Sequence, residues 1–364
     1  MPTFPAITNR THREEEHHDE NSHIEHVSLL PPLDYDEERQ SFIKLDPPGF
    51  FIRHPPAPHL LKSFITPDDD LFQTIHMGAA VVDLSAWRLT VTGLVKRPFT
   101  LDLQTLKLFP ATTITSFHEC YGSPLKPPLE PLWRVGNVTW TGVRLSTILQ
   151  LAEPLNSARY IWSEGLDRGT FATFQADRYQ KDLPISKAMS EELLLAYEIN
   201  GEPLSKERGG PVRLIVPGYF GTNSTKWLCT LRVEGERAKD TIFTTKFYNH
   251  EGDVERPVWE VEVNSMITRP EPEEIVVGQQ VRVEGWAWDE VGVKGVEISV
   301  DGGRNWVEAK VEERVEFSWQ KYEISLTLTK GKWTVMARAR ARDGKMQPLE
   351  GHRNRCHMVE FEVD

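Results

Sequence analysis

The chain has 364 residues and a formal net charge of −12 at pH 7, and it is 39% hydrophobic and 26% charged. This length and composition are typical of a globular protein with two or three folded domains. The negative charge argues against nucleic acid or anionic membranes as partners, because proteins that bind them collect lysine and arginine. No apolar stretch approaches the roughly 18 residues that span a bilayer, so we expect no nucleic acid and no membrane among the partners.

The N-terminal segment, residues 1–25, is charged and rich in histidine, with almost no large apolar side chains. Such a segment cannot bury enough surface to offset the entropy of ordering, so we predict a disordered tail. The run "EEEHHDENSH" (14–23) could bind a metal ion, but a solvated charge run is the better interpretation. Because the segment also lacks the apolar core of a signal peptide, we expect a cytoplasmic location.

Residues 40–250 mix two kinds of pattern. The runs "WRLTVTGL" (87–94) and "VRLIVPG" (212–218) predict strands, whereas "LSTILQLA" (145–152) and "SKAMSEELLLAYEIN" (186–200) predict helices. Both patterns within one segment predict a mixed α/β domain.

After about residue 258 the helical pattern disappears. Short alternating segments follow one another, separated by turn residues such as Asp-Gly-Gly at 301–303. This spacing predicts that residues 258–364 form an all-β sandwich of the immunoglobulin type, so the fold class of the whole chain is α+β.

The three cysteines cannot all pair, and we expect free thiols. Cys229 and Cys356 lie in apolar strand patterns and are expected to be small buried side chains. Cys120 differs because it ends a β-branched run and precedes a loop rich in glycine and proline, where sites are often built. A thiolate there can be a nucleophile, with His118 two residues away as its base, or a soft metal ligand.

Four specific stretches occur in a fixed order along the chain. They are "FHECYGS" (117–123), "LWRVGNVTWTGVRLSTIL" (132–149), "EGLDRGT" (164–170) and the block "AYEINGEPL…GGPVRLIVPG…TKWL" (196–228). Together they resemble the sulfite oxidase family of molybdopterin enzymes, and the resemblance covers residues 45–364. It implies a molybdopterin-binding catalytic domain at 40–250, an immunoglobulin-like dimerisation domain at 258–364, a homodimer and a molybdenum–molybdopterin cofactor, without the family's haem domain.

Under this resemblance Cys120 is the molybdenum ligand, which agrees with the need of high-valent molybdenum for a soft anionic donor. Other residues stand where the family contacts the pterin or its phosphate: His76, Asp167, Arg208, Arg213, Ser224, Thr225 and Lys226. Arg208 replaces the family's usual histidine. Outside the matched block, Arg213 would be an ordinary strand residue.

Two aromatic residues are expected at the reacting end of the site. Tyr248 lines up with the tyrosine that hydrogen-bonds the molybdenum oxo group in the family, and Trp133 lines up with a tryptophan of the substrate pocket. For both residues, packing in the core is the alternative.

The chain departs from the family at the arginines that bind sulfite or nitrate. These positions hold Thr74, Leu125 and Glu350. A one-residue gap would bring Arg353 into the last position, and Glu119 adds a carboxylate beside the cysteine. Because arginine forks complement oxyanions, their loss predicts a poor sulfite site.

We therefore expect a molybdopterin-dependent oxidoreductase that acts by two-electron oxo transfer on a small organic molecule, neutral or cationic. Its electron acceptor is not identified by the sequence. Two alternatives stay open. One is a true sulfite oxidase with rearranged basic residues, and the other is a non-redox protein that keeps the fold and binds ligands or uses His118 and Glu119 for acid–base chemistry.

Overall fold

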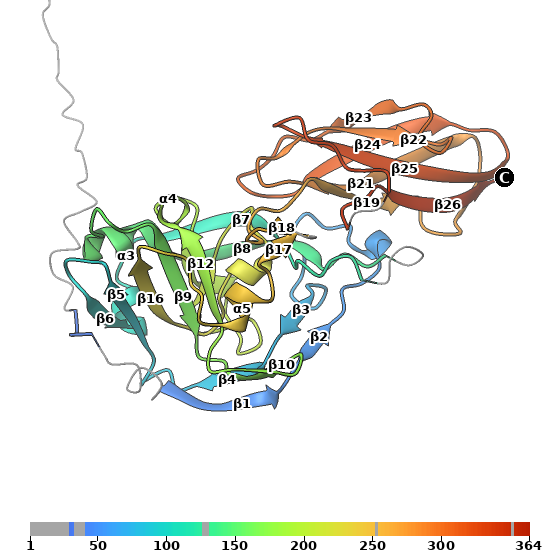
Figure 1. Cartoon of the computed structure of the whole chain (residues 1–364). Coiled ribbons are helices and arrows are strands. Elements are labelled where there is room, and N and C mark those ends of the chain that lie inside the picture. Colours follow the sequence, from blue (N-terminus) through green and yellow to red (C-terminus); the bar gives the residue numbers. More distant parts are fainter. Residues whose placement is uncertain (1–28, 33–40, 126–130, 252–253, 351–352) are drawn as a thin grey trace, which may run out of the picture.

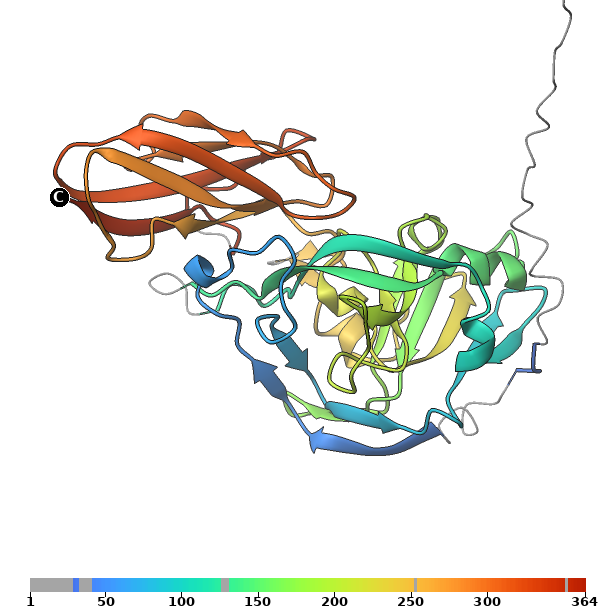
Figure 2. The same cartoon turned by 180° about the vertical axis from the view of Figure 1, so that it is seen from behind.

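The structure is a computed structural model that describes residues 29–32, 41–125, 131–251, 254–350 and 353–364. The predicted N-terminal tail, residues 1–25, lies outside the described residues. The described chain forms two lobes, a larger mixed lobe and a smaller lobe built from strands (Figures 1 and 2). None of its helices is long and apolar enough to cross a membrane.

Two sheets form the frame of the first lobe. The strands of one sheet lie in the order β12 (Gln180–Pro184), β9 (Tyr160–Gly165), β16 (Leu228–Glu234), β5 (Arg88–Gly93) and β6 (Phe99–Asp102). The strands of the other lie in the order β14 (Glu202–Pro203), β13 (Leu194–Ile199), β8 (Val135–Arg144) and β7 (Ala111–Glu119), with β15 (Arg213–Ile215) paired to β13. The pairs within these sheets are antiparallel except β16 with β5, which is parallel.

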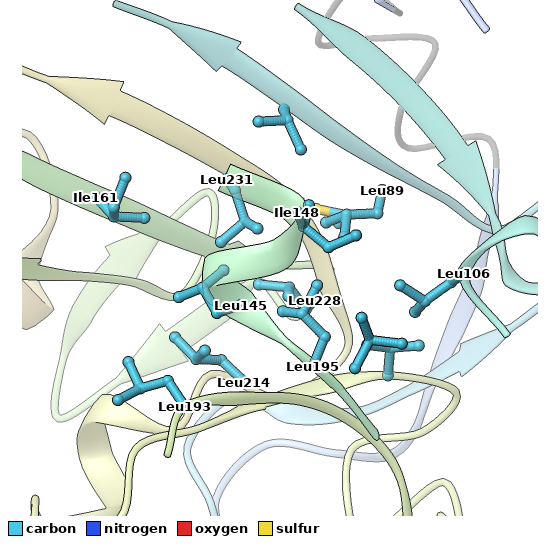
Figure 3. Close-up of a cluster of buried hydrophobic side chains, with 14 of the residues drawn as sticks. Leu89, Leu106, Leu145, Ile148, Ile161, Leu193, Leu195, Leu214, Leu228 and Leu231 are labelled. Carbon is cyan, nitrogen blue, oxygen red and sulfur yellow. The ribbon is translucent and has the colours of Figure 1, made fainter. Parts of the chain in front are cut away.

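The main core of this lobe draws aliphatic side chains from both sheets and from α3 (Leu145–Ala152), as Figure 3 shows. Leu89 of β5, Leu195 of β13 and Ile148 of α3 are all fully buried. The helix was predicted, and its apolar residues recur every three or four positions, which places them on one buried face.

The helix predicted over residues 186–200 is mostly wrong. Only α4 (Ile185–Ala188) is helical there, and β13 follows it. β13 pairs with β8 on one edge and with β14 and β15 on the other. Because both faces of this strand are covered, its apolar run is nearly continuous, and such a run does not distinguish a buried strand from a helix.

Short ribbons and single turns complete the first lobe and carry several site residues. The ribbons pair β1 (Phe42–Pro48) with β4 (Gly78–Val82), β2 (Phe51–Arg53) with β3 (Gln73–Ile75), β10 (Gly169–Phe171) with β11 (Phe174–Ala176), and β17 (His250–Glu251) with β18 (Val254–Glu255). The turns are α2 (Leu103–Leu106), α5 (Ile242–Thr245), η3 (Pro58–Leu60) and η4 (Gly221–Asn223).

The described residues of the second lobe contain strands and no helix, as predicted. The strand order is β19 (Asn264–Arg269), β21 (Gln280–Trp288), β24 (Gln320–Thr327), β23 (Val307–Val311), β22 (Val293–Ser299), β25 (Gly331–Ala341), β26 (His357–Val363) and β20 (Ile275–Val276). Side chains of β26 alternate between buried and exposed along the strand, so one face packs on the core. The immunoglobulin type of this lobe stays a prediction.

Tryptophans of the second lobe pack against the first lobe. Trp286 and Trp319 stack with ring centroids 4.6 Å apart. Trp286 Nε1 donates to the carbonyl of Leu61 at 2.6 Å, and Trp288 Nε1 donates to Glu119 Oε2 at 2.8 Å. The end of β7, and with it Cys120, therefore lies close to the junction of the two lobes.

Candidate active site

A cavity of about 730 Å³, part of it open to solvent, lies in the first lobe. Its walls come from β3, the end of β7, the loop after β9 and residues 208–227. All but two of the predicted site residues line it: Cys120, His76, Asp167, Arg208, Arg213, Ser224, Lys226 and Tyr248. The structure thus brings together residues that lie far apart in the sequence.

Cys120 is the first residue after β7, and the chain turns at this point. Its N–H donates to the carbonyl of Arg134 at 2.9 Å, and its own carbonyl accepts from the N–H of Ser123 at 3.0 Å. The side chain is a free thiol, and Thr74 Oγ1 lies 3.8 Å from its Sγ. Because the backbone is held on both sides, the sulfur has a fixed place at the cavity wall.

The two residues before the cysteine lie on opposite faces of β7. His118 lines the cavity with its ring stacked on Phe72, the centroids being 5.6 Å apart. Burial, and then the charge of Arg213, hold the pKa of His118 well below its usual range. Glu119 is fully buried on the other face, where burial raises the pKa of its carboxyl to about 7. Glu119 therefore gives the cavity no carboxylate, contrary to expectation, because successive strand residues point in opposite directions.

Arg213 begins β15 and is 3% exposed. Its Nη1 and Nη2 donate to the carbonyls of Arg208 and Ser224 at 3.0 and 3.1 Å, and its Nε has no hydrogen-bond partner among the described residues. Burial, and then the charge of Arg208, lower the pKa of Arg213 to about 9. A bound anion would raise the pKa of Arg213 again, since it favours the charged guanidinium.

Lys226, which is partly buried, is the second cation of this wall. Its Nζ donates to the carbonyls of Thr74 and Glu207 at 3.1 and 3.0 Å. Burial, and then the charge of Arg213, hold the pKa of Lys226 well below its usual range. Both cations donate to neutral carbonyls, so neither charge is balanced by a carboxylate. Together they can bind a phosphate group in the cavity.

Asp167 follows β9 and supplies an acceptor on the same side. It is 3% exposed, and its Oδ1 has no hydrogen-bond partner in the part of the chain that the structure describes. Burial raises the pKa of its carboxyl to about 7. A buried acceptor without a partner is costly, and a ring N–H donor such as those of a pterin would satisfy it.

Arg208 lines the cavity but is engaged with the loop before β3. Its Nε donates to Asp68 Oδ1 at 2.6 Å, and its Nη1 donates to the carbonyl of Phe72 at 2.8 Å. Its Nη2 donates to the carbonyls of Asp68 and Leu71 at 2.7 and 3.1 Å. Arg208 therefore contributes charge to the cavity more than it contributes unused donors.

Tyr248 and His76 meet across the cavity, with Tyr248 Oη 2.7 Å from His76 Nε2. Tyr248 has a φ of 62°, a left-handed conformation that side chains other than glycine rarely adopt. Burial, and then the neighbouring Cys120, raise the pKa of Tyr248. Burial, and then the charges of Lys226 and Arg134, lower the pKa of His76 to about 3. At neutral pH the pair is an uncharged hydroxyl beside an uncharged imidazole.

Two predicted residues do not line the cavity. Trp133 is buried beside the second lobe, where its ring meets that of His357 edge to face at 4.5 Å. Thr225 is fully buried, and its Oγ1 lies 2.7 Å from Ser163 Oγ in the sheet. Packing in the core, the alternative for Trp133, describes its surroundings.

The structure also shows where the three residues lie that replace the family's oxyanion-binding arginines. Thr74 lines the cavity, whereas Leu125 and Glu350 do not, and Glu350 is exposed at the surface. The expected carboxylate of Glu350 is therefore not part of the site. Arg353 Nη2 donates to Glu262 Oε2 at 2.6 Å, and its guanidinium lies over the ring of Phe220 at 4.2 Å, outside this cavity.

Sequence reasoning missed two residues near the cavity. Tyr179 stacks on His76 with centroids 5.5 Å apart, and its Oη donates to the carbonyl of Thr222 at 2.6 Å. Arg134 is 6% exposed, and its Nη1 donates to Thr74 Oγ1 at 3.4 Å. Arg134 lies inside the matched stretch at 132–149, but its orientation depends on a strand register that the sequence does not print.

The donor set fits a cofactor that brings its own metal ligands. No group of three or more histidine, cysteine, aspartate or glutamate residues that could hold a metal ion occurs in the described ranges. A metal beside Cys120 therefore needs further ligands from a non-protein group, as the dithiolene of molybdopterin provides. The two cations, Arg213 and Lys226, match the phosphate of such a group, and the unpartnered Asp167 Oδ1 matches its ring.

Comparison with known proteins agrees with this site. Residues 76–242 match the model of the oxidoreductase molybdopterin binding domain, and residues 255–361 match that of the Mo-co oxidoreductase dimerisation domain. The chain is 30% identical over 335 residues to mitochondrial sulfite oxidase of Mus musculus, with 84% of this chain and 61% of that protein covered. It is also 30% identical over 311 residues to sulfite oxidase of Arabidopsis thaliana, with 76% and 78% covered.

Comparison with a solved structure supports the same family. The sulfane dehydrogenase SoxCD from Paracoccus pantotrophus matches with a TM-score of 0.72 and 25% identity, covering 93% of this chain and 87% of that chain. The chain spans less than two thirds of the mouse relative, 61% of its length. Both domain models, the relatives and this fold lead to one conclusion: the chain belongs to the sulfite oxidase family of molybdopterin-binding oxidoreductases.

Proposed function

We propose that this protein is a molybdopterin-dependent oxidoreductase whose substrate is a neutral or cationic organic molecule instead of sulfite. The observation that supports this is the presence of a threonine, Thr74, beside the thiol of Cys120. Thr74 Oγ1 lies 3.8 Å from Cys120 Sγ, at the position where the resemblance expects an oxyanion-binding arginine. A short neutral hydroxyl cannot replace the hydration of a sulfite dianion, so sulfite is expected to bind weakly.

The protein's part in such a reaction is to bind the cofactor and to orient the substrate. When bound, the cofactor supplies a two-electron redox step with oxygen-atom transfer. Arg213 and Lys226 hold its phosphate, Asp167 accepts from its ring, and Cys120 is the thiolate ligand. Tyr248 stays protonated at neutral pH because its pKa is raised, so its hydroxyl serves as a hydrogen-bond donor to the substrate.

The acid–base alternative receives less support from the geometry. It needs His118 and Glu119 on one side of the strand, but they lie on opposite faces of β7. Burial also holds His118 neutral over the ordinary pH range. Oxidation of sulfite itself remains the second candidate, favoured by sequence identity to sulfite oxidases of mouse and Arabidopsis thaliana.

Two measurements on the purified full chain test the proposal. Elemental analysis and pterin fluorescence should find molybdenum and pterin in equal amounts, and their absence would reject the cofactor. Ferricyanide reduction with sulfite should then be slower than with arginine-bearing relatives by at least about a hundredfold, because two or three charge-assisted contacts are lost. Efficient sulfite turnover would instead support the second candidate.

A further inference from the structure

His118 is a histidine of the cavity wall to which the proposed function gives no role. It lines the cavity from β7, and neither of its ring nitrogens has a hydrogen-bond partner among the described residues. Another histidine of the wall, His76, is already engaged, because its Nε2 lies 2.7 Å from Tyr248 Oη. An imidazole carries at least one N–H whether it is neutral or charged, so His118 keeps a hydrogen-bond donor at any pH.

Packing holds the His118 ring in one position. The ring stacks on Phe72 at an interplanar angle of 12°, with the centroids 5.6 Å apart, and it meets Trp140 edge to face at 5.7 Å. On another side, a Cβ built on Gly221 would lie 2.9 Å from His118 Nε2, so the glycine lets the ring approach the backbone of η4. The imidazole is therefore preorganised at the cavity wall by its neighbours.

The strand places this ring on the same side as the thiol. His118 and Cys120 both line the cavity, whereas Glu119 between them is turned toward the second lobe, where its Oε2 accepts from Trp288 Nε1. Two residues along an extended strand span roughly 7 Å. A metal ion bound to Cys120 would therefore have the imidazole beside it on the same wall.

A donor near a metal-bound sulfur changes the redox properties of the metal. A hydrogen bond to such a sulfur draws negative charge away from it, so the bond stabilises the reduced metal more than the oxidised metal. Thr74 Oγ1 approaches Cys120 Sγ to 3.8 Å, but no hydrogen bond joins His118 to this sulfur. The sulfur atoms left for His118 are those that the cofactor brings.

We propose that His118 donates a hydrogen bond to a dithiolene sulfur of the cofactor and thereby raises the reduction potential of the molybdenum. The inference rests on the cofactor part of the proposed function and on no particular substrate. It gives the imidazole a tuning role and no part in proton transfer. A higher potential favours electron flow from the substrate to the metal, so the electron acceptor must itself have a high potential.

A redox titration of the molybdenum-loaded full chain tests this directly. Dithionite and ferricyanide are the titrants, and electron paramagnetic resonance of Mo(V) is the readout. His118→Phe keeps the stack on Phe72 and removes the N–H. The equilibrium constant for one-electron reduction should fall about tenfold, the usual effect of losing a charge-assisted hydrogen bond, and this lowers the midpoint potential by about 59 mV.

Two further variants and a control separate hydrogen bonding from packing. His118→Gln, whose side-chain amide can donate, should show a smaller shift than His118→Phe. If His118→Phe does not fold or does not bind molybdenum, His118→Leu takes its place, and the same loss is expected. His54→Phe is the matched control, because His54 is exposed and does not line the cavity, so its potential should equal that of the wild type.

Three results would overturn the inference. They are a wild-type potential in the loaded variant that lacks the N–H, an equal shift in His118→Gln, and an equal shift in the His54 control. Metal and pterin analysis separates this failure from failure of the proposed function. A wild-type chain without molybdenum and pterin rejects the proposed function, whereas loaded variants with unchanged potentials reject only the role of His118.

Discussion

The thiol of Cys120 is the only sulfur among the described residues that line the cavity. Thr74 Oγ1 approaches its Sγ to 3.8 Å, and the side chain packs at the edge of a buried apolar cluster without belonging to it. Its place at a turn is set by backbone hydrogen bonds that do not depend on the side chain. A change of this atom should therefore alter chemistry and leave the fold intact.

Cys120→Ser should bind molybdenum poorly and lose redox activity, because a hydroxyl is a much poorer soft ligand than a thiolate. Circular dichroism and thermal unfolding should match the wild type, and metal analysis with ferricyanide reduction measures the loss. Cys356→Ser is the control, since Cys356 is 2% exposed in the second lobe and does not line the cavity. Unchanged turnover in Cys120→Ser would remove this residue from the mechanism.

Thr74→Arg should raise kcat/KM for sulfite by about tenfold to a hundredfold, since a partly buried arginine–oxyanion contact is worth about 1.5 to 3 kcal/mol. Thr74→Val, which removes the hydroxyl without adding charge, is the control and should not gain. Steady-state kinetics with sulfite and ferricyanide measures both. No gain in the arginine variant would mean that missing charge at residue 74 does not limit sulfite turnover.

Among the helices and strands, some could be predicted from the sequence and others could not. The strands after residue 258 and the helix at 145–152 follow from side-chain periodicity, because each has one buried and one exposed face. β13 was predicted as helix because both its faces are buried. Trp133 and Arg134, which precede β8, show a finer limit. Neighbouring residues of an extended segment face opposite ways, and the sequence does not tell which of the two lies beside Thr74 at the cavity wall.

β12 supports the turn that presents Tyr248. Lys181 of this strand is fully buried, and its Nζ donates to the carbonyls of Phe243 and Tyr248 at 3.2 and 3.5 Å. Lys181→Met keeps the volume and removes these donors, so the left-handed turn should loosen, with a loss of about 1 to 3 kcal/mol in unfolding free energy. Turnover should fall more than substrate affinity.

Thermal unfolding and steady-state kinetics check the effect of Lys181→Met. Lys239→Met is its control, because that side chain is 74% exposed and pairs with Glu236 at the surface. Equal behaviour of the two variants would contradict a supporting role for Lys181. A change in stability without a change in turnover would limit that role to packing.

β26 carries a pH-sensitive contact with β19. His357 Nδ1 accepts from the N–H of Ile267 at 2.9 Å, and burial, then Arg355, lower the pKa of His357 to about 3. The unfolded chain titrates near 6.5, so below this pH it binds a proton that the folded chain does not. Stability should therefore fall as the pH drops, by about 2 kcal/mol between pH 7 and pH 5.

Denaturant unfolding of the wild type and His357→Gln, followed by tryptophan fluorescence at pH 5 and pH 7, checks this slope. The glutamine can accept from Ile267 but does not titrate, so its stability should vary less with pH over this range. Parallel pH dependence in the two proteins would mean that other groups cause the acid sensitivity.

For the molecule as a whole, the second lobe is the expected contact between two copies. Residues 255–361 match a dimerisation domain, and apolar side chains of this lobe remain exposed, including Val277 at 87% and Ile275 at 64%. We predict a homodimer with a two-fold interface that buries more than about 1,200 Å² in total. Light scattering at micromolar concentration should give twice the mass of one chain, and a monomer would contradict the prediction.

The pair of cations at the cavity wall, buried Arg213 and partly buried Lys226, has a consequence for how the protein matures. Without a bound anion, each charge sits in a poorly solvating interior, and both pKa values are depressed accordingly. A ligand that binds only the folded chain adds about 4 kcal/mol of stability at a thousand times its Kd. Cofactor insertion thus also determines which newly made chains persist. Chains without the cofactor unfold more often, so proteases degrade them faster than chains that have bound it.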